Sequence, residues 1–187
     1  MVNRCILVAG GAGFIGSNIV DHLIDHTDTP KVIVIDNLST GRLSNITKFK
    51  YNPRLQVVIG DITDKKTCAR VCENVDAVIC QAALGSVQRS MKTPTISHDN
   101  NVHGFMNLLD AARKAGVKRF IYASSSAVYG NTKDICDLDY CNPISFYGLT
   151  KHVNDLYANY YSKYFGMECI GLRYHNVFGK YQSCTGE

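Results

Sequence analysis

The stretch Cys5-Ile-Leu-Val-Ala-Gly10-Gly-Ala-Gly13-Phe-Ile-Gly16 lies near the start of this 187-residue chain. Its first five residues form an apolar run typical of a buried strand, and residues 14–24 carry apolar side chains at helical spacing. Gly10 permits a tight turn, Gly13 lets the backbone approach a pyrophosphate, and Gly16 lets the helix pack closely on the strand. A strand, a glycine turn and a helix in this order predict a phosphate site at the helix N-terminus.

An acidic residue at the end of the second apolar run extends this prediction to a dinucleotide. Asp36 follows residues 32–35 and lies about 20 residues after Gly16, where a carboxylate accepts hydrogen bonds from the adenosine ribose. Its charge would repel a 2′-phosphate, and no arginine follows it directly. The sequence therefore favours NAD over NADP. A role as a turn or helix cap is the disfavoured alternative for Asp36. Asp61 is equally suited to contact adenine or to cap a helix near Thr63.

Apolar runs alternate with helical patterns along the whole chain. This alternation predicts an α/β fold, a Rossmann-like doubly wound parallel sheet of about six strands with helices on both faces. Besides residues 5–9, the expected strands are residues 32–35, 55–59, 77–80, 119–123 and 169–172, and the expected later helices are residues 98–115 and 146–165. Residues 38–54 and 129–145 are expected to be polar, turn-rich loops.

Composition excludes several classes of partner. The net charge of +4 is spread along the chain, so we expect neither nucleic acid nor a membrane as partner. The N-terminus has no signal-peptide pattern, and three of the eight cysteines, Cys5, Cys80 and Cys169, lie in apolar runs. Cys68 and Cys72 are four residues apart on an expected helix without further metal ligands nearby. We therefore expect reduced thiols, no metal site and a cytoplasmic location.

A tyrosine and a lysine one helical turn apart are the candidate catalytic pair. Tyr147 and Lys151 share one face of an expected helix. A cation about 4 Å away in a partly shielded site contributes roughly 4 kcal/mol, or about three pKa units, toward a tyrosinate near neutral pH. Ser124-Ser-Ser126 ends the fifth strand, at the edge where open α/β sheets bind ligands. A serine there could orient the reacting oxygen, while capping is expected to occupy at least one of the three.

Together these motifs resemble the extended short-chain dehydrogenase/reductase family, and within it the nucleotide-sugar 4-epimerases. The resemblance covers essentially the whole chain, and its run Ala82-Ala-Leu-Gly-Ser-Val-Gln-Arg-Ser90 is most similar to epimerases of UDP-N-acetylglucosamine and related sugars. The other matching motifs are GGAGFIGS from Gly10, Asp36-Asn-Leu-Ser-Thr-Gly41, Gly60-Asp-Ile62, Gln81-Ala-Ala-Leu84, Asn100-Asn-Val102, Ser124-Ser-Ser-Ala-Val-Tyr-Gly130, Tyr147-Gly-Leu-Thr-Lys151 and Leu172-Arg-Tyr-His-Asn-Val-Phe-Gly179.

The resemblance implies a role for each matched position. Tyr147 would be the base, Ser125 the catalytic hydroxyl, and Lys151 the partner of the nicotinamide ribose. The substrate would meet Ser125, Tyr147, Gly85, Asn176 and Ser126, the last beside the sugar C2 substituent. The cofactor would meet Tyr147, Lys151, Gly10, Gly13, Phe14, Ile15, Gly16, Asp36, Asn37, Ser39, Thr40, Gly41, Asp61, Ile62, Ala82, Ala83, Leu84, Asn100 and His175.

The implied reaction is epimerisation of a UDP sugar at C4 through transient oxidation by NAD. A nucleotide-sugar dehydratase, the nearest rival, resembles this pattern but carries an Asp-Glu pair where this chain has Ser126 and Ala127. A simple dehydrogenase or reductase, and a non-catalytic NAD-binding remnant or interaction module, are further alternatives.

Two features depart from the family pattern. His175 stands where these epimerases usually have phenylalanine. Its backbone could keep the contact to nicotinamide with different ring packing, and a surface histidine without a role is the equal alternative. The chain also ends where the family's substrate domain would begin, so we expect residues 1–180 to form the NAD domain and residues 181–187 to start the next. From this we expect weak NAD binding and negligible turnover by the 187 residues alone. The resemblance further implies a homodimer formed through residues 98–115 and 146–165.

Overall fold

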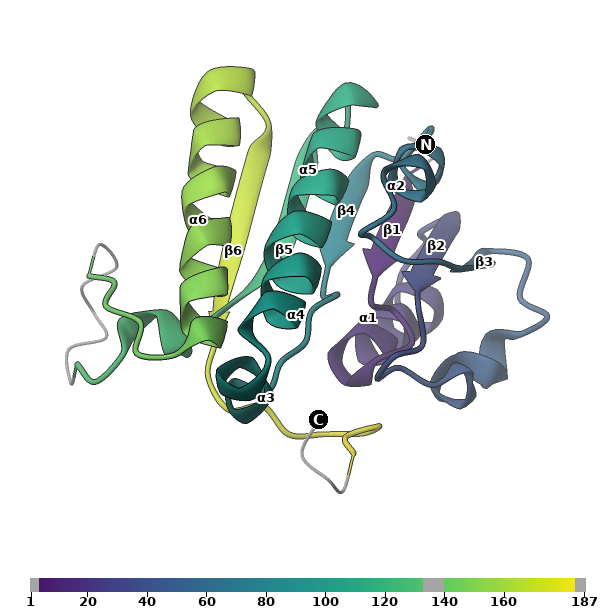
Figure 1. Cartoon of the computed structure of the whole chain (residues 1–187). Coiled ribbons are helices and arrows are strands. Elements are labelled where there is room, and N and C mark those ends of the chain that lie inside the picture. The colour runs from purple at the N-terminus through teal and green to yellow at the C-terminus, as the bar shows by residue number, and fades with distance from the viewer. Residues whose placement is uncertain (1–3, 133–139, 184–187) are drawn as a thin grey trace.

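The computed structural model describes residues 4–132 and 140–183 (Figure 1). Six strands form one sheet in the order β3-β2-β1-β4-β5-β6, and every neighbouring pair is parallel. The strands are β1 (Cys5–Ala9), β2 (Lys31–Asp36), β3 (Leu55–Ile59), β4 (Ala77–Cys80), β5 (Arg119–Ser125) and β6 (Glu168–Tyr174). This confirms the predicted Rossmann-like sheet, and each predicted strand lies within an observed one.

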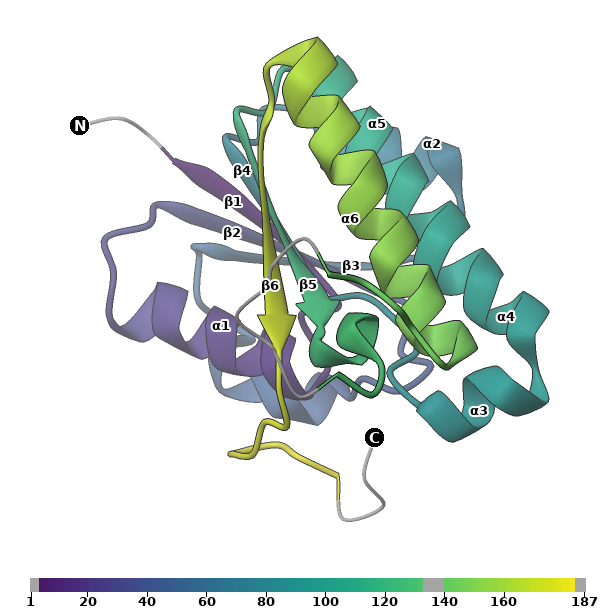
Figure 2. The same ribbon diagram turned by 90° about the vertical axis from the view of Figure 1, so that its left-hand side faces the viewer.

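Helices cover both faces of the sheet, as Figure 2 shows. One face carries α1 (Phe14–Asp25) and the short 3₁₀ helix η1 (Leu43–Phe49), and a core that includes Val8, Val34 and Phe49 lies beneath them. The opposite face carries α2 (Lys65–Val71), α5 (Phe105–Lys114) and α6 (Phe146–Phe165) over a larger core around Phe120 and Leu108. The short helices α3 (Val87–Lys92) and α4 (Pro94–His98) precede α5.

The strand order places a crevice beside β1. The chain leaves β1 toward β2 on one side, while β4 pairs with β1 on the other. The loops after β1 and β4 therefore part at the carboxyl edge of the sheet, which is where doubly wound folds bind their ligands. All six strands are parallel, so the residues that follow β2, β3, β5 and β6 reach the same edge.

Two predicted segments differ from the observed structure. The helix expected over 98–115 is broken by a π-helical segment, η2 (Asp99–Gly104), between α4 and α5. This segment turns the buried side chain of Asn101 toward the backbone of Leu84. The loop expected over 38–54 contains η1, because Ile46 and Phe49 are three residues apart and both enter the core. Of the expected loop over 129–145, residues 133–139 lie outside the described residues.

The cysteines lie where their sequence context predicts. Cys5, Cys80 and Cys169 are in strands, and Cys68 and Cys72 lie in and at the end of α2. Burial raises the pKa of both Cys68 and Cys72 to about 12, so these thiols stay protonated. Within the described ranges, no three or more His, Cys, Asp or Glu side chains gather as metal ligands would. None of the helices in those same ranges is long and apolar enough to cross a bilayer.

The C-terminal segment runs back toward α1. Asn18 Nδ2 donates to the Lys180 carbonyl at 2.8 Å, and the Tyr181 hydroxyl donates to Asp21 at 3.1 Å. These contacts place Lys180 and Tyr181 beside α1. The remainder of the predicted 181–187 segment, residues 184–187, lies outside the described residues.

Candidate active site

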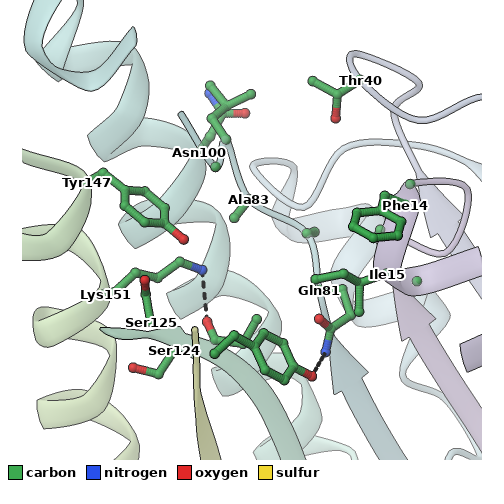
Figure 3. Close-up of a pocket in the computed structure, with 18 of the residues that line it drawn as sticks. Phe14, Ile15, Thr40, Gln81, Ala83, Asn100, Ser124, Ser125, Tyr147 and Lys151 are labelled. Atoms are coloured by element: carbon green, nitrogen blue, oxygen red, sulfur yellow. Dashed lines mark hydrogen bonds between the residues drawn. The ribbon is translucent and has the colours of Figure 1, made fainter. Parts of the chain in front are cut away.

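A cavity of about 720 Å³ opens at the carboxyl edge of the sheet (Figure 3). Its size is in the range of cofactor sites. All three predicted catalytic residues, all predicted substrate residues and all predicted cofactor residues except Gly41 line it. Gly41 instead lies behind the wall, where an added Cβ would be 2.8 Å from Asp36 Oδ1. The sequence motifs thus converge on one space.

The glycine turn forms one wall of the cavity. Gly10 adopts a φ of +75°, and a Cβ on it would lie 2.7 Å from the backbone nitrogen of Ala82. A Cβ on Gly16 would lie 2.0 Å from the Gly10 carbonyl oxygen, so the first turn of α1 packs directly on the loop. Gly13 is the N-cap of α1 and brings no side chain to its first amide groups. The positive end of a 12-residue helix therefore faces the cavity, as a pyrophosphate site requires.

Asp36 closes β2 beside this turn. It is 8% exposed, and its two oxygens accept the amides of Ala12 at 2.9 Å and Leu38 at 2.8 Å. The turn-capping role that the sequence disfavoured is therefore present. It coexists with a place in the cavity wall, because each carboxylate oxygen can accept a second hydrogen bond. The arrangement leaves a fixed negative charge where an adenosine ribose would lie.

Asp61 and Asn37 form the neighbouring part of the wall. Asn37 Nδ2 donates to Asp61 at 2.7 Å, and the Thr63 amide donates to the other Asp61 oxygen at 2.8 Å. Burial alone would raise the pKa of Asp61, but these hydrogen bonds outweigh it and the pKa lies below its ordinary value. The alternative that Asp61 caps the following helix is wrong, because Asp64 is the N-cap of α2. Asp61 instead holds a turn open to the cavity.

Ala82, Ala83, Leu84 and Gly85 run along the centre of the cavity. The side chain of Asn101, which sequence reasoning did not select, holds this run in place. It accepts the Leu84 amide at 2.7 Å and donates to the Leu84 carbonyl at 3.1 Å and to Thr150 on α6 at 3.3 Å. Asn100 lines the cavity beside it. The π-helical segment thus connects the cavity wall to α6. Its irregular helical geometry is the feature that marks Asn101 as functional, and the sequence pattern does not display that geometry.

The predicted catalytic residues come together at the far end of the cavity. Lys151 is only 4% exposed, and its Nζ donates to the Ala123 carbonyl at 2.8 Å and lies 5.8 Å from the centre of the Tyr147 ring. Figure 3 shows the Tyr147 hydroxyl and the Lys151 ammonium pointing into the same space, with Ser125 beside them. The Ser125 hydroxyl also accepts the Ala127 amide at 3.1 Å and so caps η3 (Ser126–Tyr129). The spacing predicted from the sequence is thus realised on one helix face.

The last wall lies near the end of β6 and includes residues to which the sequence motifs assigned no role. Tyr174, Gln81 and Gln182 line the cavity, and Gln81 Nε2 lies 3.4 Å from the Tyr174 hydroxyl. His175 and Asn176 follow on an exposed stretch that also borders the space. The signal was available, because Gln81 and Tyr174 both lie within matched motifs.

Comparison with known proteins agrees with this geometry. A sequence profile of the NAD dependent epimerase/dehydratase family matches residues 6–186. A putative UDP-glucose 4-epimerase of Methanocaldococcus jannaschii is 42% identical over an aligned length of 186 positions, and the match covers 97% of this chain and 59% of the relative. The chain thus spans somewhat under two thirds of the length of the curated relatives it matches.

Two solved structures show the same fold. A UDP-N-acetylglucosamine 4-epimerase of Methanobrevibacter ruminantium has a TM-score of 0.90 and 34% identity, covering 98% of this chain and 58% of its own. A dTDP-glucose 4,6-dehydratase of Streptomyces venezuelae, solved with NAD, has a TM-score of 0.91 and 35% identity, covering 96% and 58%. NAD is the family's cofactor, and the glycine turn, the helix terminus and Asp36 fit it. This chain belongs to the NAD dependent epimerase/dehydratase family.

Proposed function

We propose that this site serves the 4-epimerisation of a UDP sugar, with Tyr147 as the base that takes the proton of the sugar 4-hydroxyl. The observation that carries the proposal is the convergence of Tyr147, Lys151 and Ser125 at one end of a cavity whose other end suits the adenosine half of a dinucleotide. When bound, NAD supplies a hydride acceptor that can return the hydride to either face of C4. The protein's own residues supply the proton chemistry and the positioning.

Each residue at the catalytic end has a distinct task in this proposal. Lys151 is held by the Ala123 carbonyl, so its ammonium stays in the cavity wall, where it stabilises a tyrosinate and bonds the nicotinamide ribose. The Ser125 hydroxyl is fixed by the Ala127 amide and can still donate its own proton to the reacting sugar oxygen. Gly85, Ser126 and Asn176 border the remaining space, where the sugar nucleotide would enter.

The wall of the cavity favours epimerisation over dehydration. Elimination of water needs an acid and a base beside the sugar, in addition to the tyrosine. Among the described residues that line the cavity, the only carboxylates are Asp36 and Asp61. Asp36 ends β2 and Asp61 follows β3, so both lie at the adenosine end. The positions after Ser125 hold Ser126 and Ala127, whose side chains cannot do this work. In this proposal, the overall likeness to a dehydratase is a likeness of fold.

The experiment measures conversion of UDP-glucose and of UDP-N-acetylglucosamine by chromatography, with NAD present. We expect negligible conversion by the 187 residues alone, because remote contacts to the nucleotide position C4, and losing such positioning costs on the order of 7–11 kcal/mol of barrier lowering. Adding the part of the Methanocaldococcus relative that the alignment leaves unmatched should produce activity. A Tyr147→Phe variant is the control.

The outcomes separate the candidate functions. Appearance of the 4-epimer that disappears with Tyr147→Phe supports the proposal. Appearance of a 4-keto-6-deoxy sugar would instead identify a dehydratase. Tight NAD binding without conversion under any of these conditions would identify a non-catalytic binding module.

We further propose that two copies pair through α5 and α6. Tyr157, Tyr160 and Tyr164 are 42–63% exposed along α6, and the rings of Tyr160 and Tyr164 stack at 5.6 Å. Tyr161, by contrast, packs against the core and donates to Asp110. An apolar stripe of this kind on one helix favours a partner surface.

A further inference from the structure

Behind the catalytic end lies a polar cluster that the proposed mechanism does not use. Asp155 is on α6, one turn after Lys151, and is not among the residues that line the cofactor cavity. Its Oδ1 accepts the Tyr122 hydroxyl at 3.0 Å, and its Oδ2 accepts the Ser124 hydroxyl at 3.0 Å and Arg173 Nε at 3.2 Å. One carboxylate therefore joins α6 to β5 through two residues and to β6 through a third.

The surroundings hold this cluster in one arrangement. A Cβ on Gly171 would lie 2.5 Å from the Tyr122 hydroxyl, so β6 leaves room for that hydroxyl only because it has no side chain there. The Arg173 guanidinium also reaches Cys141 Sγ at 3.3 Å and lies 4.8 Å from the centre of the Tyr129 ring. The side chains of Arg173 and Asp155 are only 20% and 15% exposed. Because water reaches these two charges poorly, removing one of them would leave the other uncompensated at a high energetic cost.

Successive residues of β5 contact Asp155 and Lys151 in alternation. Tyr122 and Ser124 bond Asp155, while the carbonyl of Ala123 between them bonds Lys151. Three successive residues of β5 are therefore tied to two residues of α6 that are one turn apart. Sliding or tilting α6 relative to β5 would break all of these bonds together. Ser125, the next residue of β5, shares the same frame.

We propose that Asp155 is a positioning residue, which fixes α6 against β5 and β6 so that Lys151 and Tyr147 meet the nicotinamide end of the cofactor. The inference rests on the proposed function, because only that function assigns Lys151 to the nicotinamide ribose. It predicts an effect confined to one half of NAD. The adenosine half meets the glycine turn and Asp36, which belong to β1, α1 and β2 on the other side of the crevice.

The experiment compares NAD with ADP, which carries only the adenosine half, by calorimetry on the 187-residue chain. Asp155→Asn keeps the shape but removes the charge, and one amide cannot accept from all three donors. We expect NAD affinity to fall about tenfold, as for the loss of a charge-assisted hydrogen bond, and ADP affinity to stay within about twofold. Asp110→Asn is the matched control, because Asp110 likewise pairs with an arginine and a tyrosine, Arg113 and Tyr161, away from the cavity. It should change neither affinity.

A milder variant guards against loss of folding. Tyr122→Phe removes one of the three donors to the Asp155 carboxylate. It should weaken NAD alone by about threefold, less than Asp155→Asn, because Ser124 and Arg173 still hold the carboxylate. If Asp155→Asn does not fold, this variant decides. Equal losses of NAD and ADP affinity, or unchanged NAD affinity in variants that do fold, would overturn the positioning role. Absence of NAD binding by the unmodified chain would instead refute the proposed function itself.

Discussion

Removing the charge of Asp36 should change which dinucleotide the chain prefers. The carboxylate lies in the cavity wall at the end of β2, and its oxygens accept hydrogen bonds from the amides of Ala12 and Leu38. In the unmodified chain it should accept the ribose hydroxyls of NAD and repel the 2′-phosphate of NADP. Asp36→Asn keeps the size of the side chain and removes only the charge and one acceptor oxygen.

Two effects set the size of the change in cofactor preference: NADP binds more tightly and NAD binds more weakly. Two unit charges about 5 Å apart at an effective dielectric of about 20 repel by roughly 3 kcal/mol, and Asp36→Asn abolishes this penalty for NADP. NAD loses a hydrogen bond to a charged group, which is worth about 1.5–3 kcal/mol. The two contributions add, so we expect the preference for NAD over NADP to fall by a factor on the order of 10³–10⁴. One buried amide, of Ala12 or Leu38, also loses its acceptor, at about 1–3 kcal/mol of folding stability.

The assay is calorimetry of both cofactors with both proteins at one ionic strength, because the repulsion is screened by salt. Asp64→Asn is the control, since Asp64 accepts two backbone amides at the start of α2 outside the cavity. It should lose stability without changing the preference. Tighter binding of NADP than of NAD by the unmodified chain would refute the reasoning. So would an Asp36→Asn protein that folds and keeps the original preference.

Three further expectations follow from the site and the core. Tyr147→Phe should leave NAD affinity within about twofold but lower epimerisation in the complemented assay by a factor on the order of 10²–10⁴, which conversion of UDP sugars will measure. Burial raises the pKa of Cys68 and Cys72 from 9.0 to about 12, so the stability that these neutral thiols contribute is complete below pH 9 and is lost as the pH rises toward 12. Urea unfolding between pH 7 and 11 should show this decline, and Cys72→Ala should flatten it. Tyr160→Glu, on the exposed stripe of α6, should favour the monomer in light scattering at high protein concentration without changing NAD affinity, whereas an unchanged mass would contradict pairing through this helix.

The parts of the fold that the sequence predicted well depend on local pattern. The six strands are continuous apolar runs, and α6 ends where Gly166 adopts a φ of +66°, a stop that the sequence displays directly. The break of the expected 98–115 helix was missed because apolar spacing does not distinguish α from π turns over six residues. The helix η1 was missed for a related reason: only Ile46 and Phe49 mark it within a polar stretch.

The two ends of the site also differ in how much of them a sequence motif predicts. At the adenosine end, Gly10, Gly16 and Asp36 act through backbone geometry and a turn within a short span of chain, so a motif contains nearly all of the information. At the catalytic end, the motif gives Tyr147 and Lys151 but not what holds them. That support comes from side chains distant in sequence, and no spacing rule connects them to the pair.

The two ends of the site should respond differently to substitutions elsewhere in the fold. The adenosine end is held by its own loop and by α1, so distant substitutions should spare it. The catalytic end depends on the placement of a 20-residue helix, and that placement depends on buried polar groups on β5, β6 and η2. An unsatisfied group in such a network costs more than a lost surface contact, because water cannot replace the missing partner. Substitutions at Asn101 or Asp155 should therefore leave a protein that still holds the adenosine half of NAD but no longer presents Tyr147 and Lys151 to the other half.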